Sequence, residues 1–82
     1  MKLLNSALAS TSGSASTTWT YVGNEAPDEI SFANDSGGDA ILVIGDHTIK
    51  VKAGESFDAT FPVTISTIDI TINGDYRLVV GV

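Results

Sequence analysis

Cysteine is absent from the 82-residue sequence, and histidine occurs once, as His47. Without cysteine, no disulfide bond can form. A zinc site needs several cysteine or histidine ligands, and one histidine does not supply it. The sequence therefore predicts no metal ligands and no cofactor.

Basic residues are scarce. Four lysines and arginines stand against ten aspartates and glutamates, which gives a net charge of -6 and an isoelectric point near 4.2. Phosphate backbones and anionic membranes repel so acidic a chain. No stretch approaches the roughly 20 apolar residues of a membrane span, and Asn5 and Ser6 interrupt the apolar start before it reaches the length of a signal sequence. We expect neither nucleic acid nor a membrane as a partner.

A helical pattern is also missing, because no window shows the 3.6-residue period over about ten positions. The sequence instead has short runs of alternating apolar and polar residues, separated by turn residues. These runs are Thr17–Val22, Glu29–Asn34, Ala40–Ile44, His47–Val51, Ser56–Phe61, Thr64–Asn73 and Tyr76–Val82. Six to seven short strands predict an all-β fold, a small antiparallel β-sandwich or barrel.

The N-terminal part differs in composition from the rest. Residues 8–18 read LASTSGSASTT, almost entirely Ser, Thr, Ala and Gly. Such a segment has little apolar surface to offset the entropy lost on ordering it. We therefore divide the chain into an extended Ser/Thr/Ala-rich N-terminal arm, residues 1–28, and a β-sandwich body, residues 29–82. The arm is either a disordered tail or a segment that lies on a neighbouring copy.

The body is organised around Asp39–Glu55, which predicts a β-hairpin. Gly45 can adopt the positive φ that a two-residue type II′ turn needs at its first central position. The first strand of this hairpin, Ala40–Ile44, is apolar on both faces, with Ile41 and Val43 on the second face. A strand of this kind is covered twice, once by its own core and once by something else. Ile41 and Val43 are therefore candidate interface residues.

Trp19 and Tyr21 lie on one face of the strand predicted at residues 17–22. Two aromatic side chains at this spacing form a platform for carbohydrate, close the edge of a core, or anchor an interface. No set of Asn, Asp and Arg residues accompanies them, which favours a core or interface role. We take them, together with Leu3 and Leu4 of the arm, as further interface candidates.

The sequence shows no constellation that could run a reaction, and we expect no enzyme and no catalytic residues. The loop Asn34–Asp39 has the oxygen-bearing residues that calcium prefers, but it matches no EF-hand and its residues are typical of a hairpin turn. Asp46 and His47 require a serine brought to them by the fold to form a hydrolase triad. A hydrolase centred on His47 is the remote alternative.

The body is small for an independent core. Domains below ~70–80 residues rarely gain more than ~3–5 kcal/mol from one core, and usually depend on disulfides, metal or association. Because disulfides are excluded and no metal site is predicted, association remains. We expect a homo-oligomer.

Four stretches of the body together resemble the small all-β virion structural proteins of tailed bacteriophages. They are IKVKAGESF at Ile49–Phe57, the Phe61-Pro62 break, the TIDITI strand at Ile68–Ile72 and the terminal YRLVV. The first of these stretches is also similar to a turn of cupin barrels, but the histidine pair and the glutamate that ligate metal in cupins are missing. The polar arm resembles those of capsid decoration, or cement, proteins.

The phage resemblance implies a non-enzymatic structural protein of the virion. Its first expectation is a capsid decoration protein that braces neighbouring subunits through its arm and an apolar strand face. Its partners are then other copies of itself and a major capsid protein or another virion protein. The alternatives are a tail or neck component, or a small carbohydrate- or receptor-binding β module.

Overall fold

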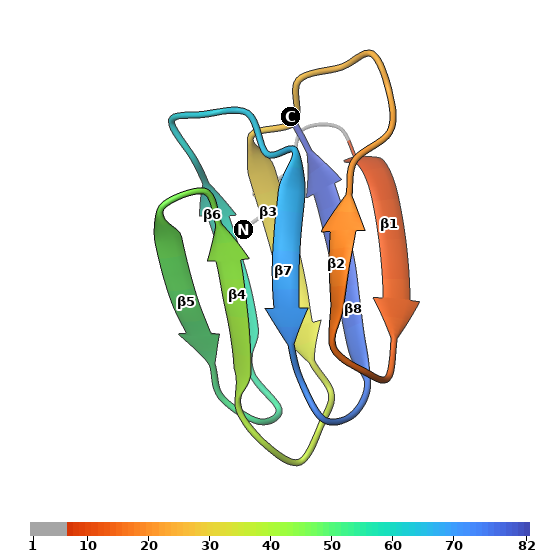
Figure 1. Ribbon diagram of the computed structural model, residues 1–82, viewed down its shortest axis with the longest axis vertical. Coiled ribbons are helices and arrows are strands. Elements are labelled where there is room, and N and C mark those ends of the chain that lie inside the picture. The colour runs from red at the N-terminus through yellow and green to blue at the C-terminus, as the bar shows by residue number, and fades with distance from the viewer. Residues whose placement is uncertain (1–6) are drawn as a thin grey trace.

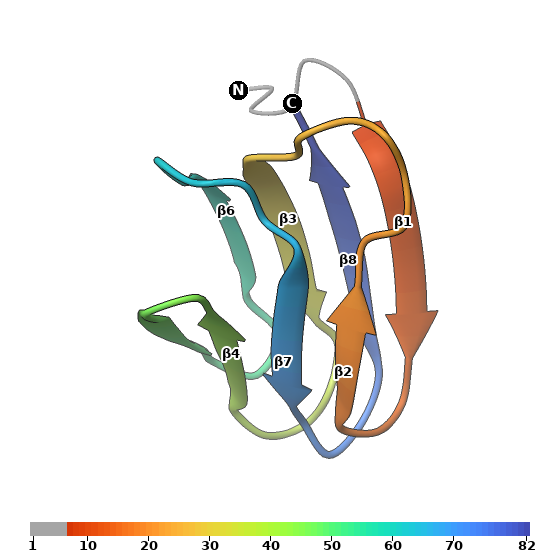
Figure 2. The same cartoon turned by 45° about the horizontal axis from the view of Figure 1, so that its top comes forward.

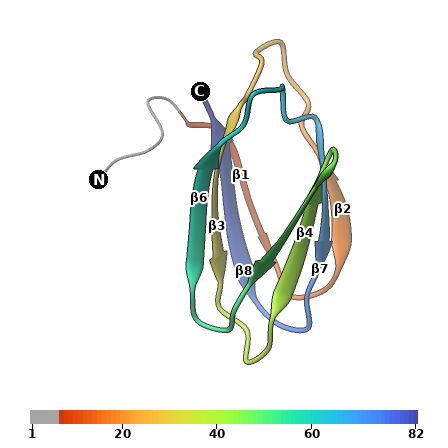
Figure 3. The same ribbon diagram turned by 90° about the vertical axis from the view of Figure 1, so that its left-hand side faces the viewer.

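The computed structural model describes residues 7–82 as eight β-strands that form two antiparallel sheets. The strands are β1 (Ala7–Gly13), β2 (Thr17–Thr20), β3 (Glu29–Asn34), β4 (Ala40–Ile44), β5 (His47–Val51), β6 (Ser56–Thr60), β7 (Thr67–Thr71) and β8 (Tyr76–Gly81). Sheet A has the order β1-β8-β3-β6 and sheet B the order β2-β7-β4-β5. The two sheets face each other (Figures 1 and 3). Residues 7–82 contain no helix that could cross a membrane.

The strands pair in order from the two ends of the described chain inward. β4 pairs with β5, β3 with β6, β2 with β7 and β1 with β8, so the chain resembles one long hairpin whose tip is the turn between β4 and β5. β3 also pairs with β8, and β4 with β7, which wraps this long hairpin into two layers. Figure 2 shows β1, β8, β3 and β6 in one layer and β2, β7 and β4 in the other. This strand order is that of an eight-stranded jelly roll.

The core lies between the two sheets and is built by the period-2 alternation of the strands. Phe32 of β3 is fully buried, and its ring stacks on that of Tyr76 of β8 with 5.8 Å between the centroids. The buried apolar residues are Ile30, Phe32, Ala40, Leu42, Ile44, Val51, Phe61, Ile65, Ile68, Ile70, Ile72, Tyr76, Leu78 and Val80. Burial of each large apolar side chain stabilises the fold by about 1.5–3 kcal/mol.

The tip of the long hairpin is the predicted type II′ turn. Gly45 has a φ of 59°, and no residue other than glycine has a positive φ in the described chain, so Asp46 keeps the negative φ that this turn type requires. The prediction is confirmed. The turn sets Ile44 opposite His47 and thereby fixes the register of β4 against β5.

Asn34 joins the loops at the opposite end of the sandwich. Its buried amide donates hydrogen bonds to the carbonyl oxygens of Gly38 and Val51, at 2.8 and 2.9 Å. Its side-chain oxygen accepts bonds from the backbone and the hydroxyl of Ser36, at 3.0 and 2.6 Å. The loop predicted as a turn after β3 is therefore closed by its own polar groups.

The all-β prediction is confirmed, and each of the seven predicted runs contains one of the strands. β6 ends before Pro62, as predicted, because proline interrupts the ladder. The predicted run Thr64–Asn73 is shorter in the structure, because β7 begins at Thr67. Ile65, which is out of phase with β7, lies in the preceding loop, fully buried, with its N–H bonded to the carbonyl of Pro27 at 2.7 Å.

The extended N-terminal arm is where the prediction was wrong. Residues 7–20 form two strands, β1 at the edge of sheet A beside β8 and β2 at the edge of sheet B beside β7. The strand count is therefore eight rather than six or seven. The backbone hydrogen bonds of the ladder order this Ser/Thr/Ala-rich segment, although it brings few large apolar side chains. The division of the chain into residues 1–28 and residues 29–82 stays a prediction.

Candidate interaction surface

Ile41 and Val43 stand on the outer face of β4, next to the middle of sheet B. Their neighbours in β4 face inward, with Leu42 fully buried, whereas Ile41 and Val43 are half-buried. No other layer of residues 7–82 lies over this face (Figures 1 and 3). The sequence predicted a strand that is apolar on both faces, and the structure confirms its geometry. We call this surface the outer face of sheet B.

Polar residues with methyl groups or long stems surround the two aliphatic side chains. Ile41 lies opposite Thr71 of β7 and Lys50 of β5, and Val43 lies opposite Thr48 of β5. On its other side, Val43 lies opposite Asp69. These neighbours present methyl groups and aliphatic stems beside charged ends.

Two polar contacts order the rim of this face. The Lys50 ammonium lies 3.7 Å from the Asp39 carboxylate, both side chains being largely exposed. The Thr18 hydroxyl donates a 2.8 Å hydrogen bond to Asp69 and so ties edge strand β2 to β7. Exposed pairs of this kind contribute little stability, so the face keeps its charges available to a partner.

Trp19 and Tyr21 occupy a different part of the molecule, the edge of the sandwich formed by β1 and β2. Both are half-buried and pack against the core. Their ring centroids are 6.4 Å apart, and the ring planes are tilted by 50°. A flat stacking platform needs rings in one plane and open to solvent, so the arrangement favours the core-edge alternative over carbohydrate binding.

The other two predicted interface residues, Leu3 and Leu4, lie outside the described residues. Of the six predicted interface residues, the structure therefore places only Ile41 and Val43 together on one face that no other part of residues 7–82 covers. Trp19 and Tyr21 form a separate pair that packs against the core at the β2 edge of sheet B.

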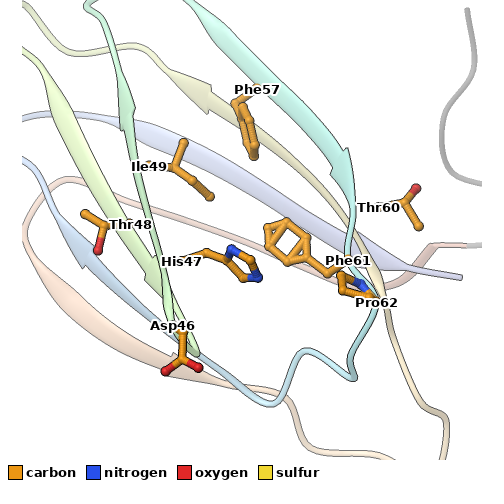
Figure 4. Close-up of a pocket in the computed structure, with 8 residues that line it drawn as sticks. All are labelled: Asp46, His47, Thr48, Ile49, Phe57, Thr60, Phe61 and Pro62. Carbon is orange, nitrogen blue, oxygen red and sulfur yellow. The ribbon is translucent and has the colours of Figure 1, made fainter.

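The edge formed by β5 and β6 carries a feature that sequence reasoning missed. A groove of about 390 Å³ lies between these strands and is lined by Asp46, His47, Thr48, Ile49, Phe57, Thr60, Phe61 and Pro62. Figure 4 shows the side chains of Ile49, Phe57 and Phe61 on the two sides of the opening. The His47 ring meets the Phe61 ring edge to face at 5.3 Å between centroids. The Phe61 ring is therefore a direct neighbour of this histidine.

Two exposed valines were also missed. Val22 is 91% exposed and Val63 is 53% exposed, and each lies in a loop at the end of the sandwich that holds the tip of the β4–β5 hairpin. These two loops are joined by a 2.9 Å hydrogen bond from the Tyr21 N–H to the Ser66 carbonyl. Single apolar residues in turns give no periodic signal, which is why the sequence did not mark them.

The shorter of the two ion pairs found within residues 7–82 joins Asp35 to Arg77. The guanidinium donates two hydrogen bonds to the carboxylate, at 2.7 and 3.1 Å. These hydrogen bonds lower the pKa of Asp35, and the nearby positive charge adds to that effect. The Asp35 carboxylate is therefore engaged in an ion pair with Arg77.

No group of three acidic, histidine or cysteine residues within residues 7–82 is arranged to hold a metal ion.

Comparison of the chain with protein-family models, curated proteins and solved structures found no match.

Proposed function

We propose that the protein is a non-enzymatic structural protein of a virion, in the first place a capsid decoration protein. It binds neighbouring subunits through the outer face of sheet B. The observation that carries the proposal is the position of Ile41 and Val43, two aliphatic side chains on the solvent side of an inner strand. Covering such a face gains free energy in proportion to the apolar area removed from water.

Two further observations support an assembly role. Residues 7–82 fold into two facing sheets without disulfides, and this size is close to the ~70–80 residues below which small domains usually depend on disulfides, metal or association. Its strand order is that of the jelly roll, an architecture used by viral capsid proteins and also by lectins and cupins. The second point is an analogy of fold, because one fold hosts many functions. A position in the tail or neck of the particle uses the same face and is the alternative within this proposal.

The solution mass of the purified chain tests the proposal. We expect light scattering across a dilution series to show a multimer for the natural sequence. Val43→Lys places a charge in the middle of the face and is expected to lower the mass, because an unpaired charge opposes burial in an interface. The variant keeps the fold, since the side chain points away from the core.

Lys52→Ala is the control, because it also changes the charge of the chain by one unit, but at an exposed position in the loop after β5. We expect its mass to equal that of the natural sequence. A natural chain that stays monomeric at every concentration, or a Val43→Lys variant of unchanged mass, overturns the proposal that this face joins subunits.

A further inference from the structure

The two lateral edges of the sandwich differ in how they are covered: β1 and β2 form one edge, and β5 and β6 form the other. At the β1–β2 side, Trp19 and Tyr21 pack against the core, whereas at the β5–β6 side the groove of about 390 Å³ reaches between the sheets. Its volume falls within the ~300–1,000 Å³ of ligand-binding pockets. One side of the sandwich is thus covered by the chain's own aromatic residues, and the other is left open.

The walls of this groove are mainly apolar. Ile49 and Phe57 face inward from β5 and β6 and remain half-exposed, although each packs against the core. Phe61 forms the floor near the end of β6 and is 7% exposed. Such walls gain free energy when an aliphatic side chain displaces water from them.

The rims of the groove are strand edges. β5 is the outer strand of sheet B and β6 the outer strand of sheet A, and each pairs with a neighbour on one side only. On its other side, such a strand presents unpaired N–H and C=O groups that an extended segment can bind. Strand addition then supplies main-chain hydrogen bonds, while alternate side chains enter the groove.

We propose that residues 1–6 of a second copy of this chain bind the groove between β5 and β6, with a leucine of that segment between Ile49 and Phe57. This inference rests on the proposed assembly role and deepens it by naming a second contact between copies. The segment reads MKLLNS and contains the adjacent leucines Leu3 and Leu4. Two of the other leucines of the chain, Leu42 and Leu78, are already buried in the core.

The reach of the chain places this contact between copies rather than within one. Leu3 and Leu4 precede Ala7 by four and three residues, so an extended backbone carries them at most about 14 Å from it. β1, which begins at Ala7, and β6 are the opposite edges of sheet A. Three strand spacings already amount to about 14 Å, before the chain turns around β6 toward the groove.

Charge favours the same occupant. Asp46 lies at the mouth of the groove, and the chain as a whole carries a net charge of -6. Lys2 is one of the four basic residues and stands next to Leu3. An arriving segment that carries a lysine is attracted to this acidic mouth, whereas an acidic segment is repelled. Two copies can exchange this contact reciprocally and close a dimer, whereas head-to-tail repetition of it builds a ring or a filament.

Disulfide trapping between two differently labelled chains tests the proposal, because the natural chain has no cysteine. One chain carries Asn5→Cys, which leaves both leucines in place, and the other, labelled with ¹⁵N, carries Thr60→Cys at the rim of the groove. After mild oxidation of the mixture, mass spectrometry identifies the cross-linked heterodimer. We expect it in clear excess over the heterodimer of Asn5→Cys with Ser12→Cys, an exposed position on β1.

A second pair of variants tests the leucines. Adding Leu3→Ser and Leu4→Ser to the Asn5→Cys chain is expected to weaken the association with the Thr60→Cys chain roughly tenfold, since a buried leucine is lost. Equal yields with Thr60→Cys and Ser12→Cys, or no effect of the serine substitutions, overturn the inference.

The outcome is separable from that of the proposed function. If Val43→Lys lowers the solution mass while no excess heterodimer forms at Thr60, only the groove contact fails. If the heterodimer forms while Val43→Lys leaves the mass unchanged, only the role of the outer face of sheet B fails.

Discussion

At the scale of single residues, two positions hold the loops of the sandwich. Gly45 fixes the hairpin tip through its φ of 59°. Asn34 is 1% exposed and satisfies its side chain through bonds to Ser36, Gly38 and Val51. A buried amide without such bonds costs about 1–3 kcal/mol, so the polar network is a condition for burying Asn34.

Gly45→Ala is expected to destabilise the protein by about 1–3 kcal/mol, because an L-residue is strained at this positive φ. Chemical denaturation followed by tryptophan fluorescence measures the change, and Trp19 is the single tryptophan. Gly37→Ala is the matched control. Gly37 has no left-handed φ, and an added methyl group meets no atom within 4 Å. We expect its stability to stay within about 0.5 kcal/mol of the natural sequence; equal effects of the two substitutions contradict the assignment of the turn.

At the scale of elements, β1 and β2 form an arch across one edge of the sandwich. β1 pairs with β8 over residues 7–13, and β2 pairs with β7 over residues 17–20. Between them, the Ser16 hydroxyl both donates to the Ile72 carbonyl, at 3.1 Å, and accepts from the Ile72 N–H, at 2.9 Å. The segment is thus joined to both sheets by main-chain and side-chain hydrogen bonds.

Deleting residues 2–18 is therefore expected to destabilise the body, since it removes β1 and the first half of β2, leaves β8 as an unpaired edge and uncovers the adjacent core. The expected decrease in the free energy of unfolding is a large fraction of the ~5–15 kcal/mol that stabilises a typical domain. Thermal unfolding monitored by circular dichroism measures it. Deleting residues 2–6 is the control: because all eight strands remain, it is expected to lower the unfolding midpoint far less than the longer deletion does. A fully stable body after the longer deletion contradicts the integral role of β1 and β2.

At the scale of the whole molecule, charge and shape act together. The net charge of -6 makes copies repel one another at neutral pH, while the outer face of sheet B and the open groove favour contact between them. Association is the balance of these effects. Assembly of many copies is favoured where a partner or the solution reduces the repulsion.

We expect the light-scattering mass of the purified chain to rise, and its solubility to fall, as the pH approaches the isoelectric point near 4.2. The carboxylates become protonated over this range, the net charge falls to zero and the repulsion between copies disappears. Added salt at neutral pH is the companion measurement. It screens the same charges, since the Debye length is about 10 Å at 0.1 M, and should also raise the mass. A mass that responds to neither pH nor salt contradicts this balance.

Much of the fold follows from local patterns in the sequence. Alternation of apolar and polar residues placed seven of the eight strands, because the side chains of a strand change face at every residue. The turn at Gly45 was predictable because its φ depends on the residue itself. The outward position of Ile41 and Val43 followed from the same alternation.

β1 was not predictable, because its residues are small and polar and its stability comes from the partner strand. Its one specific signal is Gly13, which lies opposite Tyr76 in the register. A Cβ at this position would lie 2.8 Å from the Tyr76 hydroxyl oxygen, so only glycine leaves room for the tyrosine ring. The need for glycine at this position can therefore be recognised only once β8 is known to lie beside β1.

The sequence by itself determined which residues form strands, where the chain turns and which side chains of each strand share a face. Only the tertiary structure decided which strands became edges, and therefore where the groove between β5 and β6 opens and how Asp35 meets Arg77 across 42 positions of the chain. The physical reason is the range of the interactions. Turn conformation and side-chain alternation are set within a few neighbouring residues, whereas an edge, a groove or a distant ion pair exists only after the long hairpin has wrapped into two sheets.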